Sequence, residues 1–160
     1  MLREIIYQTQ HFLTMRLDSI VFLCLLFFST CAINAQKQAV NNPQEETLIR
    51  QTIATYFEGW MTGDTTKLGR AMHTTCQLKN IKDDGVIIFD RATYLGFFKP
   101  RPRRENAGGR VVSINITDDI AAAKCEIYTA DRLYTDYFNM MKVKGEWYIV
   151  DKIATNKAKE

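Results

Sequence analysis

The chain has 160 residues, of which 46% are hydrophobic and 24% are charged, and its formal net charge is +3. This composition is typical of one globular domain with an added segment. A net charge of +3 is too small to indicate nucleic-acid binding. A phosphate-binding loop is also excluded, because the glycine pair at residues 108–109 lacks the spacing of such a loop.

The added segment is at the N-terminus. Residues 20–28 form an apolar run, and small and polar residues follow it up to Ala35. The run is too short to cross a bilayer as a permanent helix. Its length and the small residues that follow it are typical of a secretory signal. We therefore expect a signal peptide over residues 1–35 and export to the periplasm or out of the cell. The long stretch before the run makes Met15 a candidate start of translation.

Two alternatives for this segment are less favoured. The first is a membrane-anchoring or buried N-terminal helix. The second is a lipid anchor at Cys31, which is disfavoured because Thr30 stands where a lipidation signal has a small Gly or Ala. Cleavage after Ala35 would leave a polar tether (36–44) and one domain (45–160) of ordinary size.

The remaining cysteines and histidine exclude common metal sites. After cleavage the domain would keep Cys76, Cys125 and a single histidine, His73. The cysteine spacing fits no zinc pattern, and one histidine cannot build a site with several histidine ligands. Both cysteines lie in strand-like runs, which favours buried free thiols over a disulfide. We therefore expect no metal and no cofactor.

The domain begins with a predicted amphipathic helix. Asn42 can accept a backbone N–H, Pro43 suits the first helical position and Glu45 can reach back toward the cap. Gly63 ends the helix. Four large side chains recur at spacings of four, three and four and form one buried stripe: Ile49, Ile53, Tyr56 and Trp60.

Two further helices flank a hairpin. Asp64 caps a short second helix that exits at His73, and residues 76–81 and 86–89 flank an Asp-Asp-Gly turn. Asp90 caps a third helix, which carries Tyr94, Leu95, Phe97 and Phe98 and stops at Pro100. The basic residues Arg101, Arg103 and Arg104 follow, and their Pro and Gly neighbours favour a solvated loop over an anion site.

Four strands complete the chain. Residues 110–117 alternate with Val112, Ile114 and Ile116 on one face, and residues 120–129 place small alanines on one side. Residues 132–154 form two long strands joined at Lys144-Gly145. Segregated helices and strands predict an α+β fold. We expect a cone-shaped barrel in which a curved antiparallel sheet wraps three N-terminal helices and leaves a pocket at its open end.

Three stretches resemble a known family. YFEGWMTGD in the first helix, AMH at the end of the second, and DYFNMMKVKGEWYIVDKI near the C-terminus are similar to the nuclear transport factor 2-like superfamily. Within it, they look most like the group called putative lumazine-binding proteins. The resemblance covers residues 45–157. It implies a cystatin-like α+β roll, a homodimer formed through the sheet, and a pocket used for binding, isomerisation or dehydration.

Six residues are candidates for contacts with a ligand in this pocket: Tyr56, Trp60, His73, Tyr94, Phe98 and Asp136. Asp136 is the main candidate for catalysis, since it lies within an apolar strand between Tyr134 and Phe138. Its carboxylate is either exposed at an edge, paired with Lys152 or Arg132, or buried with a raised pKa.

Three interpretations of function remain open from the sequence. One is an exported domain that binds a small organic ligand or a protein partner. The second is an isomerase-like or dehydratase-like enzyme that uses Asp136 as acid or base, with Tyr56 or His73 as hydrogen-bond donor. The third is a non-catalytic structural dimer whose cavity is filled by Phe97, Phe98 and Met140. The catalytic constellation of the steroid isomerases in this superfamily is incomplete here, because no second pocket carboxylate is visible.

Overall fold

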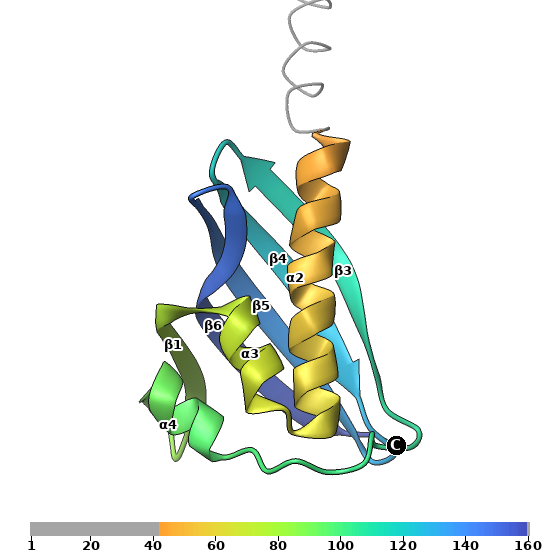
Figure 1. Ribbon diagram of the computed structural model, residues 1–160. Helices are drawn as coiled ribbons and strands as arrows, with labels where there is room; N and C mark the ends of the chain where they lie inside the picture. The colour runs from red at the N-terminus through yellow and green to blue at the C-terminus, as the bar shows by residue number, and fades with distance from the viewer. Residues whose placement is uncertain (1–41, 160) are drawn as a thin grey trace, which may run out of the picture. The chain divides into compact units, whose positions relative to one another are not determined.

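A curved six-stranded sheet packs one face against a long helix, α2 (Pro43–Thr62), as Figure 1 shows. Two short helices, α3 (Thr65–Ala71) and α4 (Arg91–Gly96), lie beside the sheet near the C-terminal end of α2. This is a computed structural model that describes residues 42–159. The predicted signal peptide, the candidate start at Met15, the alternative of a lipid anchor at Cys31 and most of the expected tether lie outside the described residues.

The strands follow the order β2-β1-β6-β5-β4-β3. Their bounds are β1 (Met72–Lys82), β2 (Gly85–Asp90), β3 (Gly108–Thr117), β4 (Ile120–Tyr128), β5 (Arg132–Val143) and β6 (Glu146–Ala158). The predicted α+β class is confirmed. All neighbouring strands are antiparallel except β1 and β6, which run parallel. The hairpin β1–β2 therefore joins the sheet beside the C-terminal strand, a long-range pairing that periodicity along the chain does not reveal.

The core lies between α2 and the concave face of the sheet. The predicted stripe supplies Ile49, Ile53 and Tyr56, all without exposed surface. On β4, Cys125 and Ile127 are equally buried, in line with the predicted alternation. Burying such side chains contributes roughly 1.5–3 kcal/mol each, so this interface supplies much of the stability of the domain.

One strand departs from the predicted alternation. The β3–β4 register shifts between Val111 and Ser113, which marks a β-bulge. Val111, Ile114 and Ile116 pack against the core, whereas Val112 is 47% exposed. The prediction that Val112 shares a face with the two isoleucines is wrong, because the extra residue of the bulge reverses the alternation.

The N-terminus of α2 is attached to the sheet by Glu45. Asn42 Oδ1 accepts the backbone N–H of Glu45 at 3.3 Å, as predicted for the cap. The Glu45 carboxylate does not turn back to the cap, because it accepts hydrogen bonds from Lys142 Nζ at 2.6 Å and Trp147 Nε1 at 2.7 Å. These hydrogen bonds lower the pKa of Glu45. The first turn of the helix is thereby held against the β5–β6 hairpin.

Cys76 and Cys125 are free and buried. They lie on β1 and β4, which are separated by β6 and β5. Three strand spacings amount to roughly 14 Å, whereas a disulfide needs Cα atoms within about 7 Å. Burial raises the pKa of each thiol to about 12. The expectation of free thiols agrees with this geometry.

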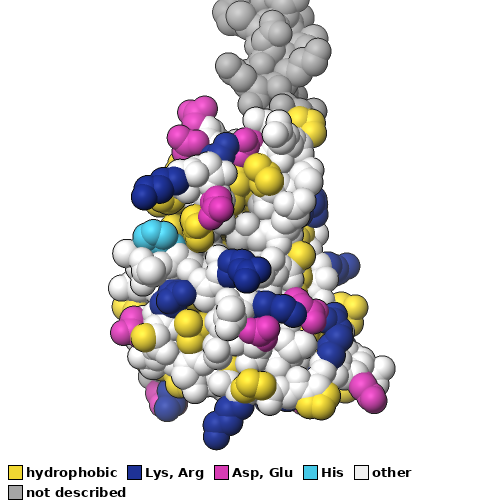
Figure 2. Space-filling model, in the orientation of Figure 1, with side chains coloured by type: hydrophobic (Ala, Val, Ile, Leu, Met, Phe, Trp, Pro, Cys, Tyr) yellow, Lys and Arg dark blue, Asp and Glu magenta, His cyan; other side chains and the backbone are white. Residues whose placement is uncertain are grey.

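The surface carries charges of both signs. Figure 2 shows Lys and Arg side chains interspersed with Asp and Glu on the face that it presents. No helix among residues 42–159 is both long and apolar enough to traverse a bilayer.

Candidate functional site

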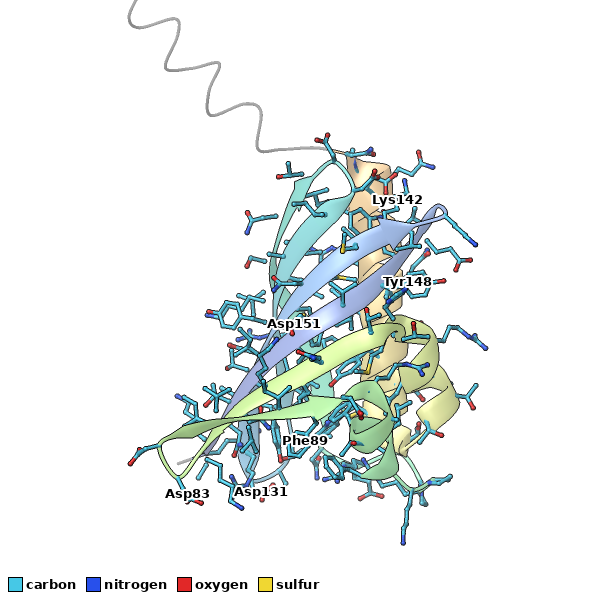
Figure 3. All side chains as sticks on the ribbon, turned by 90° about the vertical axis from the view of Figure 1, so that its left-hand side faces the viewer. Asp83, Phe89, Asp131, Lys142, Tyr148 and Asp151 are labelled. Atoms are coloured by element: carbon cyan, nitrogen blue, oxygen red, sulfur yellow. The ribbon has the colours of Figure 1, made fainter. Side chains whose placement is uncertain are left out.

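A cavity of about 180 Å³ opens between the sheet and α4. It lies toward the end of the sheet that carries the β1–β2 and β4–β5 turns, where Figure 3 labels Asp83 and Asp131. Its walls come from α2, α4 and four strands, and the residues that line it are Trp60, Leu78, Asn80, Tyr94, Phe97, Phe98, Ile127, Tyr134, Asp136, Lys152, Ala154, Thr155 and Asn156.

The cavity leads from an exposed mouth to a buried base. Phe97, Thr155 and Asn156 are exposed, whereas Asp136 and Lys152 at the base are 1% and 5% exposed. The walls between them are mainly aromatic and aliphatic. A mostly apolar pocket with a few convergent polar groups is the usual form of a small-molecule site.

Aromatic side chains form one wall. The rings of Trp60 and Tyr134 meet edge to face at 5.3 Å, and those of Tyr94 and Phe98 at 5.0 Å. Phe97 packs against Phe89 at 5.1 Å beside α4, where Figure 3 labels Phe89. Because α4 ends at Gly96, Phe97 and Phe98 follow the helix and were wrongly placed inside it by the sequence analysis. The cavity remains open beside these two rings, and Met140 does not line it.

A buried ion pair occupies the base. Lys152 Nζ lies 3.0 Å from Asp136 Oδ2, and it also donates a hydrogen bond to the Tyr56 hydroxyl at 2.8 Å. The Tyr56 and Tyr94 hydroxyls share a hydrogen bond of 2.6 Å. Among the described residues, neither oxygen of Asp136 has a well-aligned hydrogen-bond partner. Lys152 therefore compensates the charge of the carboxylate and contacts Oδ2, whereas Oδ1 is left without a partner among the described residues.

Burial and charge set the protonation of this cluster. Burial raises the pKa of the Asp136 carboxyl, and the nearby Lys152 ammonium opposes that change. Burial alone would lower the pKa of Lys152, but the charge of Asp136 and its neighbour Tyr94 outweigh burial, so the pKa is raised. Burial also raises the pKa of Tyr56 well above its ordinary value. The 3.0 Å contact of Asp136 with the Lys152 ammonium is the geometry of an ion pair, and the raised pKa values of Tyr56 and Tyr94 keep both phenols neutral near neutral pH.

Five of the six predicted ligand-contact residues gather here. Trp60, Tyr94, Phe98 and Asp136 line the cavity, and Tyr56 lies beneath it in the hydrogen-bonded cluster. Of the three environments considered for Asp136, two coincide, since it is both buried with a raised pKa and paired with Lys152. The other candidate cation, Arg132, donates to Asn156 instead.

His73 lies elsewhere. It is the second residue of β1, where Nδ1 contacts the Thr75 hydroxyl at 2.8 Å and the ring packs against Tyr148 at 5.8 Å. It does not line the cavity. The polar groups of His73 and Thr75 therefore satisfy each other. The expected pocket role of His73 has no geometric support. Within residues 42–159, no group of three or more His, Cys, Asp and Glu side chains could hold a metal ion.

Other residues of the cavity were not predicted as contacts. Alternation along β5 from Asp136 places Tyr134 on the same face, and alternation along β6 from Lys152 places Ala154 and Asn156 there. That signal was present in the sequence. Leu78 and Asn80 carry no such signal, since they reach the cavity only through the parallel pairing of β1 with β6.

The basic loop after α4 supports α2 and is not an open anion site. Arg101 donates to the backbone oxygen of Trp60 at 2.6 Å, and Arg103 pairs with Glu58. Arg104 lies over the Trp60 ring, 5.1 Å from its centroid. All three guanidinium groups thus contact the last turns of α2, where cations complement the helix dipole.

The fold and this site define a class of proteins. The chain matches the family described as putative lumazine-binding over residues 44–153. It therefore belongs to the putative lumazine-binding family, as the resemblance indicated. No curated protein matches the chain significantly.

Solved structures agree with this assignment. An NTF2-like protein of unknown function from Shewanella baltica OS155 is 22% identical with a TM-score of 0.67, and the match covers 74% of this chain and 98% of that one. A cystatin-like domain of unknown function from Nostoc punctiforme PCC 73102 is 14% identical, with a TM-score of 0.55 and coverage of 74% and 80%.

A ketosteroid isomerase-like protein from Erwinia carotovora atroseptica SCRI1043 is 9% identical, with a TM-score of 0.53 and coverage of 69% and 94%. At such identities these likenesses show the fold alone. They confirm the predicted nuclear transport factor 2-like, cystatin-like α+β roll.

The ion pair predicts the effect of removing its anion. Asp136→Asn leaves the Lys152 ammonium buried without a counter-charge, and we expect the free energy of unfolding to fall by about 3–5 kcal/mol. Urea denaturation at neutral pH measures it. The control is Asp151→Asn, since Asp151 pairs with Lys79 in a more exposed position. Equal, small effects of the two variants would show that the buried pair does not stabilise the fold.

Removing the ammonium of Lys152 should make the stability of the domain depend on pH. In Lys152→Met the Asp136 carboxyl loses the ammonium that opposes burial, so its folded-state pKa rises further above the unfolded value of about 3.9. The folded state then binds more protons at this group, so the contribution of Asp136 to stability is greatest below its unfolded pKa. It falls as pH rises from about 4 toward 7, by at most about 1.4 kcal/mol per pH unit.

Urea denaturation across this pH range tests this expectation, with Lys79→Met as the matched control. Stability that stays level or increases with pH in Lys152→Met, relative to the control, would contradict the assigned environment of Asp136.

Proposed function

We propose that this domain binds a small organic molecule in the cavity between α4 and the sheet. The observation that carries the proposal is the cavity itself: an exposed mouth, apolar walls and a buried, charge-balanced base in which Oδ1 of Asp136 has no partner. Core packing alone does not require Asp136 and Lys152, because a hydrophobic pair of similar volume is often at least as stable as a buried ion pair. The family name supports a binding role and leaves the identity of the ligand open.

A cavity-filling variant tests the proposal. Ala154 lines the cavity directly beside Asp136 in the β5–β6 register, so Ala154→Phe should occupy the space that a ligand needs. Xenon and toluene are suitable probes, since apolar cavities of similar size bind such molecules. We expect chemical-shift changes at cavity residues in the wild type and at least a tenfold weaker response in Ala154→Phe, roughly 1.4 kcal/mol.

The matched control is Ala54→Phe, the same change at an exposed position of α2. It should leave the response unchanged. Equal responses in the two variants, with both folded, would place the binding of the probes outside this cavity. Native mass spectrometry of the purified protein would also reveal a copurified molecule.

Proton-transfer catalysis is a second candidate function. It is favoured by one observation, a buried Asp136 with a raised pKa and free acceptor positions, which is the environment of a general base. Tyr56 is engaged by Lys152 and Tyr94, and His73 lies outside the cavity. The positive charge that could stabilise a developing oxyanion beside Asp136 is that of Lys152, which is itself engaged by Asp136 and Tyr56. Exchange of deuterium from the solvent into a bound carbonyl compound would detect this activity. If compounds bind without such exchange, binding is the only function that remains.

A homodimer formed through the convex face of the sheet also belongs to this proposal. Tyr137 and Ile153 face each other in the β5–β6 register and are 52% and 51% exposed. Ile120 and Met141 form a second neighbouring exposed pair on β4 and β5. Exposed apolar patches of this kind are typical of protein interfaces.

We expect sedimentation to show a dimer in the wild type and at least a tenfold weaker association, about 1.4 kcal/mol, in Tyr137→Glu. Ala54→Phe again serves as the control, because Ala54 lies on α2. A monomeric wild type would rule out this interface.

Export to the periplasm or out of the cell is the remaining part of the proposal. It is supported by the apolar run at residues 20–28 and the small residues that follow. Mapping the N-terminus of the protein isolated from cells tests it, and retention of residues 20–28 would argue against cleavage at Ala35.

A further inference from the structure

The base of the cavity contains a hydrogen-bond acceptor without a partner, whereas its hydrogen-bond donors are already engaged. Asp136 is 1% exposed and lines the cavity; Lys152 contacts its Oδ2, and no hydrogen-bond donor among residues 42–159 reaches its Oδ1. Lys152 already contacts Asp136 at 3.0 Å and Tyr56 at 2.8 Å. The Tyr94 hydroxyl is engaged by Tyr56. A ligand group that reaches the base therefore meets a carboxylate that needs a donor.

Charge balance limits the ligand further. The Lys152 ammonium already neutralises Asp136, so the base has no net charge to attract an ion. An anionic ligand would place a second negative charge beside the carboxylate, and a cation would meet the ammonium at close range. In a cavity with apolar walls, either ion would also lose its hydration. The base therefore favours an uncharged group that donates a hydrogen bond.

The size and walls of the cavity indicate the rest of the molecule. Its volume of about 180 Å³ slightly exceeds that of an apolar cavity of about 150 Å³ that holds benzene. The edge-to-face pairs Trp60–Tyr134 and Tyr94–Phe98 form aromatic walls, and aromatic rings pack well against such walls. The enclosed space thus accommodates one ring, and any larger part of a ligand would project through the mouth near Phe97 and Asn156.

We propose that the cavity selects uncharged aromatic or heteroaromatic rings that carry an N–H or O–H donor, and that Asp136 is the residue that determines this specificity. The inference rests on the proposed binding function and adds a ligand class to it. Asp136 accepts the hydrogen bond of the ring substituent. Lys152 positions the carboxylate and cancels its charge, while Tyr56 and Tyr94 hold the ammonium in place.

Three one-ring probes separate the ligand class from binding as such. Phenol and toluene have nearly the same shape and differ in the donor, and benzoate carries a negative charge. We expect titrations of the full chain at neutral pH to show phenol binding about tenfold or more tighter than toluene, since a hydrogen bond to a charged acceptor is being gained. Benzoate should bind more weakly than phenol by at least a similar factor.

The outcomes distinguish the two proposals. Equal affinities for phenol and toluene, or tightest binding of benzoate, would overturn the donor specificity while leaving the cavity as a binding site. No binding of any probe would overturn both proposals.

A variant pair assigns the preference to Asp136. Because Asp136→Asn alone is expected to be less stable, the test uses the double variant Asp136→Leu with Lys152→Met, which replaces both charges by apolar side chains. We expect it to fold and to lose the preference for phenol over toluene. Asp151→Asn, which changes the neighbouring residue of β6, should keep the preference. A preference that persists in a folded double variant would show that another group accepts the hydrogen bond and would overturn the role of Asp136.

Discussion

The buried contact between Asp136 and Lys152 is the constraint around which the domain is arranged. Transferring two charges out of water costs several kcal/mol per ion, and only close, well-supported geometry offsets that cost. The support comes from four elements, because β5 carries Asp136, β6 carries Lys152, α2 carries Tyr56 and α4 carries Tyr94. Any shift of α2 or α4 across the sheet would leave a charge or a phenol without a partner.

This arrangement also explains why the site lies at one end of the sheet. At the end of the sheet that carries the β5–β6 turn, the concave face is closed by α2, whose first turn is attached to the β5–β6 hairpin through Glu45. Near the other end, the short α4 and the rings that follow it cover the sheet incompletely, and the cavity remains there. The cavity is thus closed toward the β5–β6 turn by the attachment of α2 and open beside α4.

Membership in the putative lumazine-binding family and the NTF2-like fold are consistent with such a pocket. A shared fold provides a curved sheet and a covering helix, whereas the chemistry depends on which side chains project inward. Here the inward set is one carboxylate, one ammonium, two phenols and an aromatic wall. Its chemistry favours a neutral ring with a hydrogen-bond donor over an ion.

The sequence by itself determined the local structure of this protein. Capping residues, the glycine after α2 and the apolar stripe of Ile49, Ile53 and Tyr56 specify helices, and alternation specifies strands, because these signals act over a few neighbouring residues. The class of fold followed from the order of these elements. Four of the six residues expected to contact a ligand line the cavity, and Tyr56 lies beneath it, although Phe98 does so from the segment after α4 and not from the helix.

Only the tertiary structure decided which of those residues act together. The parallel pairing of β1 with β6 brings Leu78 and Asn80 to the cavity, and the bulge in β3 turns Val112 outward. The choice of Lys152 over Arg132 as the partner of Asp136 depends on the β5–β6 register and on the curvature of the sheet. Such contacts join residues far apart in the chain, so their geometry follows from the packing of the whole domain and not from the pattern within any one segment.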